Sequence, residues 1–445
     1  MMETMRPNKY QNNLCQKFPK RTAQIGWMFI LLLSMGVSQA ARSQFIVKAQ
    51  IRPRTEVRHG YGTLASRSDR TAVFTSQRSR LLLQYVRPDY RIGLSLQDIR
   101  VWGDEEQLKD VASAAVHEAW AEIFFSKNLS VKLGRQELVY DDHRLLGNVN
   151  WAQQARSHDA AVLKWHRNGW QADVGAAYNN QKATLFRTVF PLNSYKSLFY
   201  MWIHRDFKNG WRASFSAITD GYQRRNISKD DVVYRYTFGP YLQYAVSQFH
   251  FSGTFYYQAG TDNLGRDIRA YMFSVTGNYH RDHTWLNAGV DYLSGTDALD
   301  AGNRRNHSFN TLYATNHKFY GFMDYFLNIP LHTANGGLLD SYGGVKLQFR
   351  QPVSVSATYH NFRLASNVAE PANPTTPIGK GLGSEIDAVV NYNFKKDINV
   401  KAGYSVLLPT SSMQILKGGN KNVTQDWAWL MISLNSELFR AVLPN

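Results

Sequence analysis

The sequence has almost no cysteine, no long apolar run beyond its N-terminal region, and too few acidic residues to balance its basic ones. Cys15 is the only thiol in 445 residues, which excludes a disulfide-stapled scaffold and a cysteine-based metal site. After residue 40 no apolar stretch approaches the roughly 20 residues that a membrane-spanning helix needs, so a polytopic helical membrane protein is excluded. No Pro/Gly/Ser-rich linker divides the chain, which favours one large unit.

The N-terminal region has the features of a secretory signal peptide. Three basic residues precede an apolar run, Ile25 to Val37, which leads into the small-x-small pattern Ser38-Gln39-Ala40. We therefore predict that residues 1–40 are removed and that residues 41–445 form a single domain. Removal lowers the formal charge from +17 to +13, because this segment holds five basic residues and one acidic residue. Such a charge predicts an anionic partner.

Polar and apolar side chains alternate in the stretch VKAQIRPRTEVR, residues 47–58. Its even positions carry Lys48, Gln50, Arg52, Arg54, Glu56 and Arg58. Because side chains on a β-strand alternate between its two faces, this pattern predicts a strand with one charged face. A soluble antiparallel sheet permits the pattern, and so does a membrane barrel, in which the apolar row faces lipid and the charged row faces a water-filled lumen.

The lengths of the connections between such runs favour the barrel. Short turns, such as RNG at 167–169 and KNG at 208–210, alternate with long polar connections, such as 139–158 and 295–339. This is the layout of an outer-membrane barrel, with short periplasmic turns and long extracellular loops. We predict an all-β transmembrane antiparallel barrel of about eighteen strands, at 45–58, 73–86, 91–101, 114–125, 129–138, 159–166, 170–179, 195–206, 211–220, 232–244, 249–259, 269–280, 284–294, 340–349, 353–363, 384–394, 398–408 and 426–438.

The second predicted strand extends the positive charge of the first. In TSQRSRLLLQY, Arg78 and Arg80 share one face, and antiparallel pairing would place them near Arg52 and Arg54. A basic side chain facing lipid costs roughly 2–4 kcal/mol at the bilayer centre, so these arginines are expected to face the lumen. Such a cluster needs an anion. The alternative is that Glu56, Glu118 and Glu122 neutralise it in a rigid charge network.

Two segments break the alternation. In RIGLSLQDIRVWG, continuing the count from Leu94 and Leu96 puts Asp98 and Arg100 on the lipid side, and Arg135 likewise falls in phase with Val131 and Leu133. Either a β-bulge shifts the register at these places or the strand has left the membrane there.

Several motifs carry a resemblance to a known family. They are LSLQDIRVWGD (94–104), HEAWAEIFF (117–125), LGRQELVYDDHRLLG (133–147), WAQQARSHDAAVL (151–163), DYLSGTD (291–297) and TNHKFYGFMDYF (315–326). Together they resemble the Bacteroidetes branch of the alginate-export outer-membrane family, most specifically in Gly134-Arg135-Gln136 and the block from Trp151 to Asp159. The resemblance covers nearly all of the chain after residue 40.

The resemblance implies an 18-stranded barrel in the bacterial outer membrane, with an arginine-rich constriction that passes an anionic polysaccharide such as alginate. It places Arg135 and Arg156 on the constriction, and the strand phasing adds Arg52, Arg54, Arg78 and Arg80. A nonspecific small-anion porin and a structural or adhesive barrel plugged by loop 295–339 are the alternatives. The expected partners are polysaccharide or small anions, membrane lipids, lipopolysaccharide and the barrel-assembly machinery.

Other function classes find little support. Ser157-His158-Asp159 is not a catalytic triad, because neighbours on an extended chain point in opposite directions. Glu118 and Glu122 would lie about 13 Å apart at about 3.3 Å per residue, too far for a glycosidase pair. Basic residues recur along strands rather than in one patch, which disfavours nucleic acid. We expect no enzyme activity, no cofactor and no metal. The loop acids Asp141 and Asp142 could hold Ca²⁺ or cations that bridge lipopolysaccharide, but we interpret them as solvated.

Overall fold

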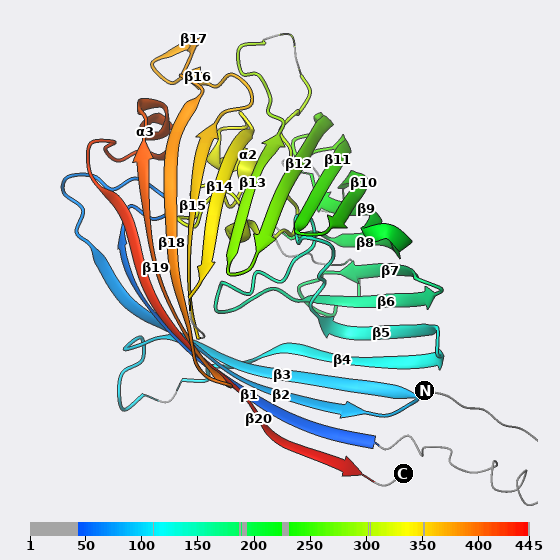
Figure 1. Ribbon diagram of the computed structural model, residues 1–445. Coiled ribbons are helices and arrows are strands. Elements are labelled where there is room, and N and C mark those ends of the chain that lie inside the picture. Colours follow the sequence, from blue (N-terminus) through cyan, green and yellow to red (C-terminus); the bar gives the residue numbers. More distant parts are fainter. Residues whose placement is uncertain are drawn as a thin grey trace, which may run out of the picture.

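The chain forms a closed antiparallel barrel in the structure, a computed structural model (Figure 1). Residues 43–443 are described, apart from residues 110, 187, 189–193, 225–230, 301, 303, 350 and 351, so the predicted signal peptide lies outside the described residues. Eighteen strands make up the barrel: β1 (Ser43–His59), β2 (Ala72–Val86), β3 (Tyr90–Val101), β4 (Ala114–Ser126), β5 (Leu129–Gln136), β6 (His158–Arg167), β7 (Trp170–Tyr178), β8 (Ser197–Asp206), β9 (Trp211–Gln223), β10 (Val232–Val246), β11 (Phe249–Thr261), β12 (Asp267–Arg281), β13 (Thr284–Leu293), β14 (Leu338–Gln348), β15 (Val353–Arg363), β18 (Gly381–Lys395), β19 (Ile398–Pro409) and β20 (Gln425–Leu443).

The first and last strands close the barrel. β1 pairs with β20 from Ser43 opposite Leu443 to His59 opposite Asp426, and the other strands pair with their neighbours in chain order. Closure leaves no free sheet edge, which is the condition for a β-structure to span a membrane. The predicted 18-stranded barrel is confirmed. In the described residues, no helix has the length and apolar character that crossing a membrane requires.

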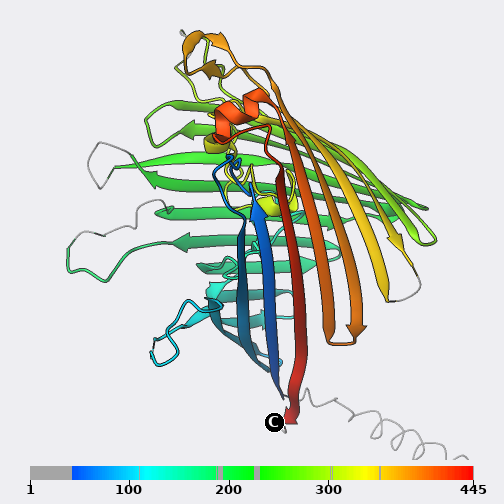
Figure 2. The ribbon, with the colours of Figure 1, turned by 90° about the vertical axis from the view of Figure 1, so that its left-hand side faces the viewer.

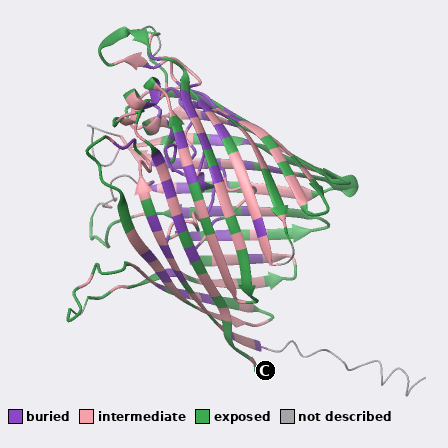
Figure 3. Ribbon diagram, turned by 60° about the vertical axis from the view of Figure 1, so that its left-hand side comes forward, coloured by how far each residue is buried: buried purple, intermediate pink, exposed green. Residues whose placement is uncertain are grey.

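Exposure alternates along the strands, as Figure 3 shows. On β18, Ile386 and Val390 are 42% and 44% exposed, whereas Glu385 and Asp387, on either side of Ile386, are 0% and 2% exposed. The apolar side chains therefore form the outer surface, and the polar side chains point into the barrel. This is the face assignment that a lipid environment requires.

The connections also follow the predicted short and long alternation. In the turn between β6 and β7, Asn168 and Gly169 both have positive φ, 50° and 80°, which suits the Asn-Gly turns of tight hairpins. A 3₁₀ turn, η1 (Lys208–Gly210), makes the connection from β8 to β9. The long connections contain η2 (Asn316–Lys318), α2 (Ile329–His332), the hairpin β16 (Ala369–Glu370) and β17 (Asn373–Pro377), and α3 (Ser411–Lys417). Figure 2 shows α3 and this hairpin together at one end of the barrel.

The structure explains the break in alternation at Asp98. β3 keeps its phase; the register shift lies in its partner β4, where Ser95 pairs with Glu118 but Leu96 pairs with Val116. Asp98 and Arg100 therefore stay on the outer face, close to the end of β3. There Arg100 Nε donates to Asp98 at 2.7 Å and Arg100 Nη1 lies 3.5 Å from Glu105. The charges sit where the strand leaves the apolar band.

The buried core lies inside the barrel, where two long connections fold inward (Figure 1). They are residues 137–157, between β5 and β6, and residues 294–337, between β13 and β14. Phe309, Met323 and Tyr325 of the second connection are 0% exposed. Its backbone meets inward-facing strand residues, with Met323 N–H donating to Glu385 on β18 at 2.8 Å.

Candidate functional site

The pairing of β1 with β2 gathers four arginines on one inner wall of the barrel. Arg52 lies directly opposite Arg78, Arg80 lies opposite Gln50, and Arg54 lies opposite Ser76. We call Arg52, Arg54, Arg78 and Arg80 the arginine wall. Their side chains point inward because each occupies an even position in a strand whose odd neighbours, such as Ile51 (47% exposed), form the outer surface.

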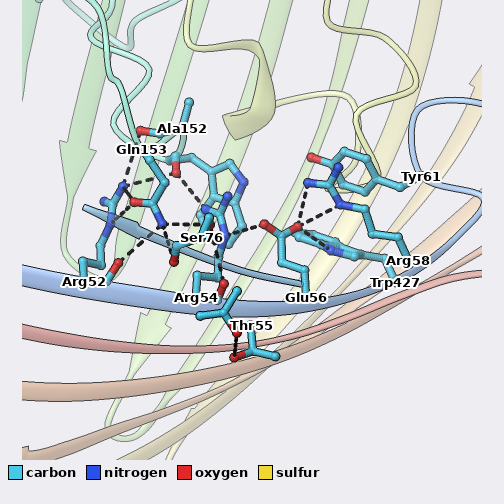
Figure 4. A network of polar contacts seen from close by, with 12 residues as sticks. Arg52, Arg54, Thr55, Glu56, Arg58, Tyr61, Ser76, Ala152, Gln153 and Trp427 are labelled. Carbon is cyan, nitrogen blue, oxygen red and sulfur yellow. Dashed lines mark hydrogen bonds and ion pairs between the residues drawn. The ribbon is translucent and has the colours of Figure 1, made fainter. Parts of the chain in front are cut away.

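Loop 137–157 reaches across the lumen and contacts three members of this wall, Arg52, Arg78 and Arg54. Arg52 donates through Nε and Nη2 to Gln153 Oε1, at 3.1 and 2.8 Å, and through Nη1 to the Asn150 carbonyl at 2.8 Å. Arg78 donates to Gln50 Oε1 at 2.7 Å, to Asn150 Oδ1 at 2.9 Å and to the Gln153 carbonyl at 3.3 Å. Arg52 and Arg78 are 5% and 1% exposed. Figure 4 shows Gln153 against Arg52 and Ser76.

The other two arginines have different partners. Arg80 donates twice to Gln97 Oε1, at 3.1 and 2.7 Å. Arg54 donates to Glu56 at 2.9 Å and to the Trp151 carbonyl at 2.8 Å, and its guanidinium carbon lies 4.1 Å from the centre of the Trp151 ring.

Charge compensation is incomplete along this wall. Glu56 forms ion pairs with Arg54 and Arg58, at 2.9 and 2.7 Å, and accepts from the Trp427 indole at 3.0 Å. Within the described part of the chain, no carboxylate lies within ion-pair distance of Arg52, Arg78 or Arg80. Glu137 and Glu118 act on Arg80 only from beyond ion-pair distance, so Arg52, Arg78 and Arg80 have no direct counter-ion among the described residues, which is costly for buried charge.

The other two glutamates expected to neutralise the wall make other contacts. Glu118 accepts from the backbone N–H of Glu137 at 3.2 Å. Glu122 accepts from Ser130 at 2.9 Å and lies 4.0 Å from Arg91. Both are on β4, and neither forms an ion pair with the arginine wall in the described structure. Of the three predicted partners, Glu56 forms an ion pair with the wall, through Arg54, and Glu118 acts on Arg80 at longer range.

The prediction that Arg135 lines the constriction is wrong, because its side chain does not face the lumen. It pairs with Ala119 on one side and Asp159 on the other, and it shares its face with the outward Leu133, which is 42% exposed. An ion pair with Asp159 at 3.2 Å holds it there, with side chains 43% and 58% exposed. It is the second-last residue of β5, near the strand end, where a charge on the lipid face costs only about 0–1 kcal/mol. Its phase with Leu133 in the sequence was the correct guide.

Arg156 lies inside the barrel but not on the arginine wall. It belongs to loop 137–157, and its Nη1 donates to the Ala314 carbonyl of loop 294–337 at 3.1 Å. Burial lowers the pKa of Arg156, while the nearby Tyr313 acts in the opposite direction. It joins the two inward loops to each other.

Loop 137–157 is also fixed to the opposite side of the lumen. Asp141 accepts from the Trp202 indole at 2.9 Å and from Ser214 at 2.5 Å. Arg144 forms a bidentate ion pair with Asp291, at 2.8 and 2.9 Å, and its Nε forms a second ion pair with Asp142. The expectation that Asp141 and Asp142 are solvated is wrong: burial raises the pKa of Asp141, and Asp142 pairs with Arg144.

A cavity of about 470 Å³ opens beside the arginine wall. Arg54, Arg58, Tyr61, Phe74 and Trp151 are among the residues that line it. Arg58 lies over the rings of Tyr61 and Phe74, at 4.0 and 4.8 Å to their centres. Aromatic faces and cationic edges thus meet in one hollow next to the wall.

Reasoning from the sequence did not assign a role to Asn150, Trp151, Gln153 or Gln97. The block from Trp151 to Asp159 and the motif LSLQDIRVWGD, which contains Gln97, gave the only signal, since both carry the resemblance. Glutamine and asparagine are uncharged, and in a loop their positions follow no β-strand alternation that would predict which way they point. Their role became visible only when the loop was placed against Arg52 and Arg78.

Comparison with known proteins agrees with this architecture. The barrel is similar to the crystal structure of OccAB1 from Acinetobacter baumannii, with a TM-score of 0.61, 10% identity, and coverage of 90% of this chain and 100% of OccAB1. It is similar to OccAB4 from the same organism, with a TM-score of 0.59, 13% identity, and coverage of 91% of this chain and 100% of OccAB4. It is also similar to OpdO from Pseudomonas aeruginosa, with a TM-score of 0.60, 14% identity and coverage of 90% and 99%. At these identities the likeness shows the fold alone. No curated protein matches the sequence.

The closed barrel, with its apolar outside and polar lumen, defines a porin-like channel protein of the bacterial outer membrane. The sequence profile described as alginate export matches residues 33–414. The chain therefore belongs to the alginate export family, as its motifs indicated. The finer assignment to the Bacteroidetes branch stays a prediction.

Proposed function

We propose that this protein is an anion-selective channel that passes an anionic polysaccharide, such as alginate or another polyuronate, along the arginine wall. The observation that carries the proposal is the set formed by the buried Arg52 and Arg78 and the half-buried Arg80, which have neutral hydrogen-bond partners and, in the described residues, no ion-paired carboxylate. Fixed positive charge in a narrow lumen raises the local concentration of anions and lowers that of cations.

A polyuronate suits such a wall because it carries one carboxylate on each sugar. Arg80 and Arg54 extend the wall on either side of the Arg52–Arg78 pair, so successive carboxylates can exchange one guanidinium for the next. Conduction requires contacts that are favourable but weak enough to release the solute. The neutral amide and carbonyl acceptors already present keep each arginine satisfied between such contacts.

A second candidate, a barrel plugged by its own loops with a structural or adhesive role, also has an observation in its favour. Phe309, Met323 and Tyr325 of loop 294–337 are fully buried, and loop 137–157 is fixed to both sides of the lumen. A small-anion porin would use the same arginines without selecting a sugar.

Solute flux into proteoliposomes separates these candidates. We expect vesicles containing the protein to take up an oligouronate faster than a neutral oligosaccharide of equal length. Equal uptake of chloride with exclusion of the oligouronate would favour the small-anion porin. Exclusion of every solute, with insertion verified, would favour the plugged barrel.

A further inference from the structure

The segment Asn150–Gln153 supplies the arginine wall with a row of oxygen acceptors. Arg52 donates to the Asn150 carbonyl and to the Gln153 side-chain oxygen. Arg78 donates to Asn150 Oδ1 and to the Gln153 carbonyl, and Arg54 donates to the Trp151 carbonyl. The single oxygen Gln153 Oε1 accepts from both Nε and Nη2 of Arg52, the edge of the guanidinium to which a carboxylate binds with its two oxygens. The loop therefore presents neutral oxygens where an anion would present charged ones.

Neutral acceptors hold a guanidinium less tightly than a carboxylate does. A carboxylate makes the same charge-assisted hydrogen bonds to the guanidinium as a neutral oxygen and adds the Coulomb attraction between the two opposite charges. An incoming carboxylate would also supply the counter-ion that Arg52 and Arg78 lack. The exchange of a loop oxygen for a carboxylate is therefore favourable.

The segment is bounded by two residues with unfavourable backbone angles. Val149, which precedes it, has φ of 50°, and Ala155, two residues beyond it, has φ of 55°. Positive φ is rare for residues with a side chain and is a genuine outlier for a β-branched residue such as valine. Backbone hydrogen bonds within the loop, such as Arg156 N–H to the Asn148 carbonyl at 2.6 Å, hold these angles together with the contacts to the wall.

We propose that Asn150–Gln153 occupies a polyuronate carboxylate-binding site on the arginine wall when no polyanion is present, and that the polyuronate displaces it. The segment acts as an internal substitute for the ligand. This inference rests on the proposed function, because it takes the polyuronate as the anion that the wall receives. It adds the location of the site and the means by which the site is closed.

Two substitutions of Gln153 test the inference in opposite directions. Gln153→Glu gives the segment a real carboxylate next to Arg52, so the apparent Kd for an oligouronate of about six sugars should rise about tenfold, as expected when a neutral acceptor becomes charged. Gln153→Ala removes the acceptor and should lower that Kd. Gln154→Glu is the matched control, because it adds the same charge one residue away on an exposed side chain. Binding is measured by calorimetry on the detergent-solubilised barrel.

The outcomes separate the two levels of the proposal. A rise with Gln153→Glu, a fall with Gln153→Ala and a change below twofold with Gln154→Glu would support displacement. Weaker binding in both Gln153 variants, or equal effects of the two glutamates, would overturn it while leaving a polyuronate channel intact. Wild-type protein that binds no oligouronate would refute the proposed substrate itself. If Gln153→Glu does not fold, the direction of the change in Gln153→Ala decides.

Discussion

Replacing Arg78 by glutamine should reduce anion selectivity without unfolding the barrel. The substitution removes one guanidinium that has no carboxylate partner, and glutamine keeps a donor able to reach Gln50 or Asn150. Like charges directly opposite each other destabilise a strand pair, and Arg78 lies opposite Arg52. The variant should therefore be at least as stable as the wild type.

The electrostatic effect can be given a magnitude. A monovalent anion about 8 Å from the guanidinium is attracted by about 2 kcal/mol at an effective dielectric constant of about 20. Loss of that attraction lowers local anion occupancy by up to about 30-fold. Screening by salt reduces the effect, so the measurement belongs at low ionic strength.

The assay is the reversal potential of single channels in a planar bilayer under a KCl gradient. Arg78→Gln should move the reversal potential towards zero. Arg135→Gln is the matched control, since it removes the same charge from the outer surface, where Arg135 pairs with Asp159. The reasoning is refuted if Arg78→Gln leaves the reversal potential unchanged, or if Arg135→Gln changes it as much.

Three further predictions concern the inward loops and the wall behind them. Glu385→Ala leaves the buried Met323 N–H without its acceptor, so the free energy of unfolding should fall by about 1–3 kcal/mol in urea titrations while single-channel conductance rises. Burial lowers the pKa of His332 from 6.5 to about 4. As pH drops from 6.5 to 4, the unfolded chain therefore binds this proton before the folded chain does, and the free energy of unfolding should fall. Thermal unfolding should show a smaller loss of stability over this pH range in His332→Gln than in the wild type. A Cβ atom at Gly403 would lie 2.3 Å from the Trp429 ring. Gly403→Val should therefore displace Trp429 and lower the unfolding temperature by several degrees. The control Val389→Ala, on the neighbouring strand, should lower the unfolding temperature by less.

Much of the barrel could be predicted because its strands obey a period of two and its turns are short and regular. The positions of Arg52, Arg54, Arg78 and Arg80 follow from that period and from the antiparallel pairing of two consecutive strands. Arg135 was misplaced because the family resemblance was preferred to its phase with Leu133.

The interior could not be predicted, because it is made by loops. Gln153 lies about a hundred residues from Arg52 in sequence, and no local pattern relates the two. The same holds for Glu385 and Met323, which are joined by a backbone N–H that has no sequence signature. Side-chain periodicity tells which residues face the lumen but not what fills it.

The most direct test of the central claim is the reversal potential of the wild-type protein in a planar bilayer under a KCl gradient, repeated with added oligouronate. If the arginine wall makes an anion-selective conduit, the current will be biased towards chloride and the oligouronate will block it. A cation-biased current, or a silent membrane with insertion verified, would contradict the account.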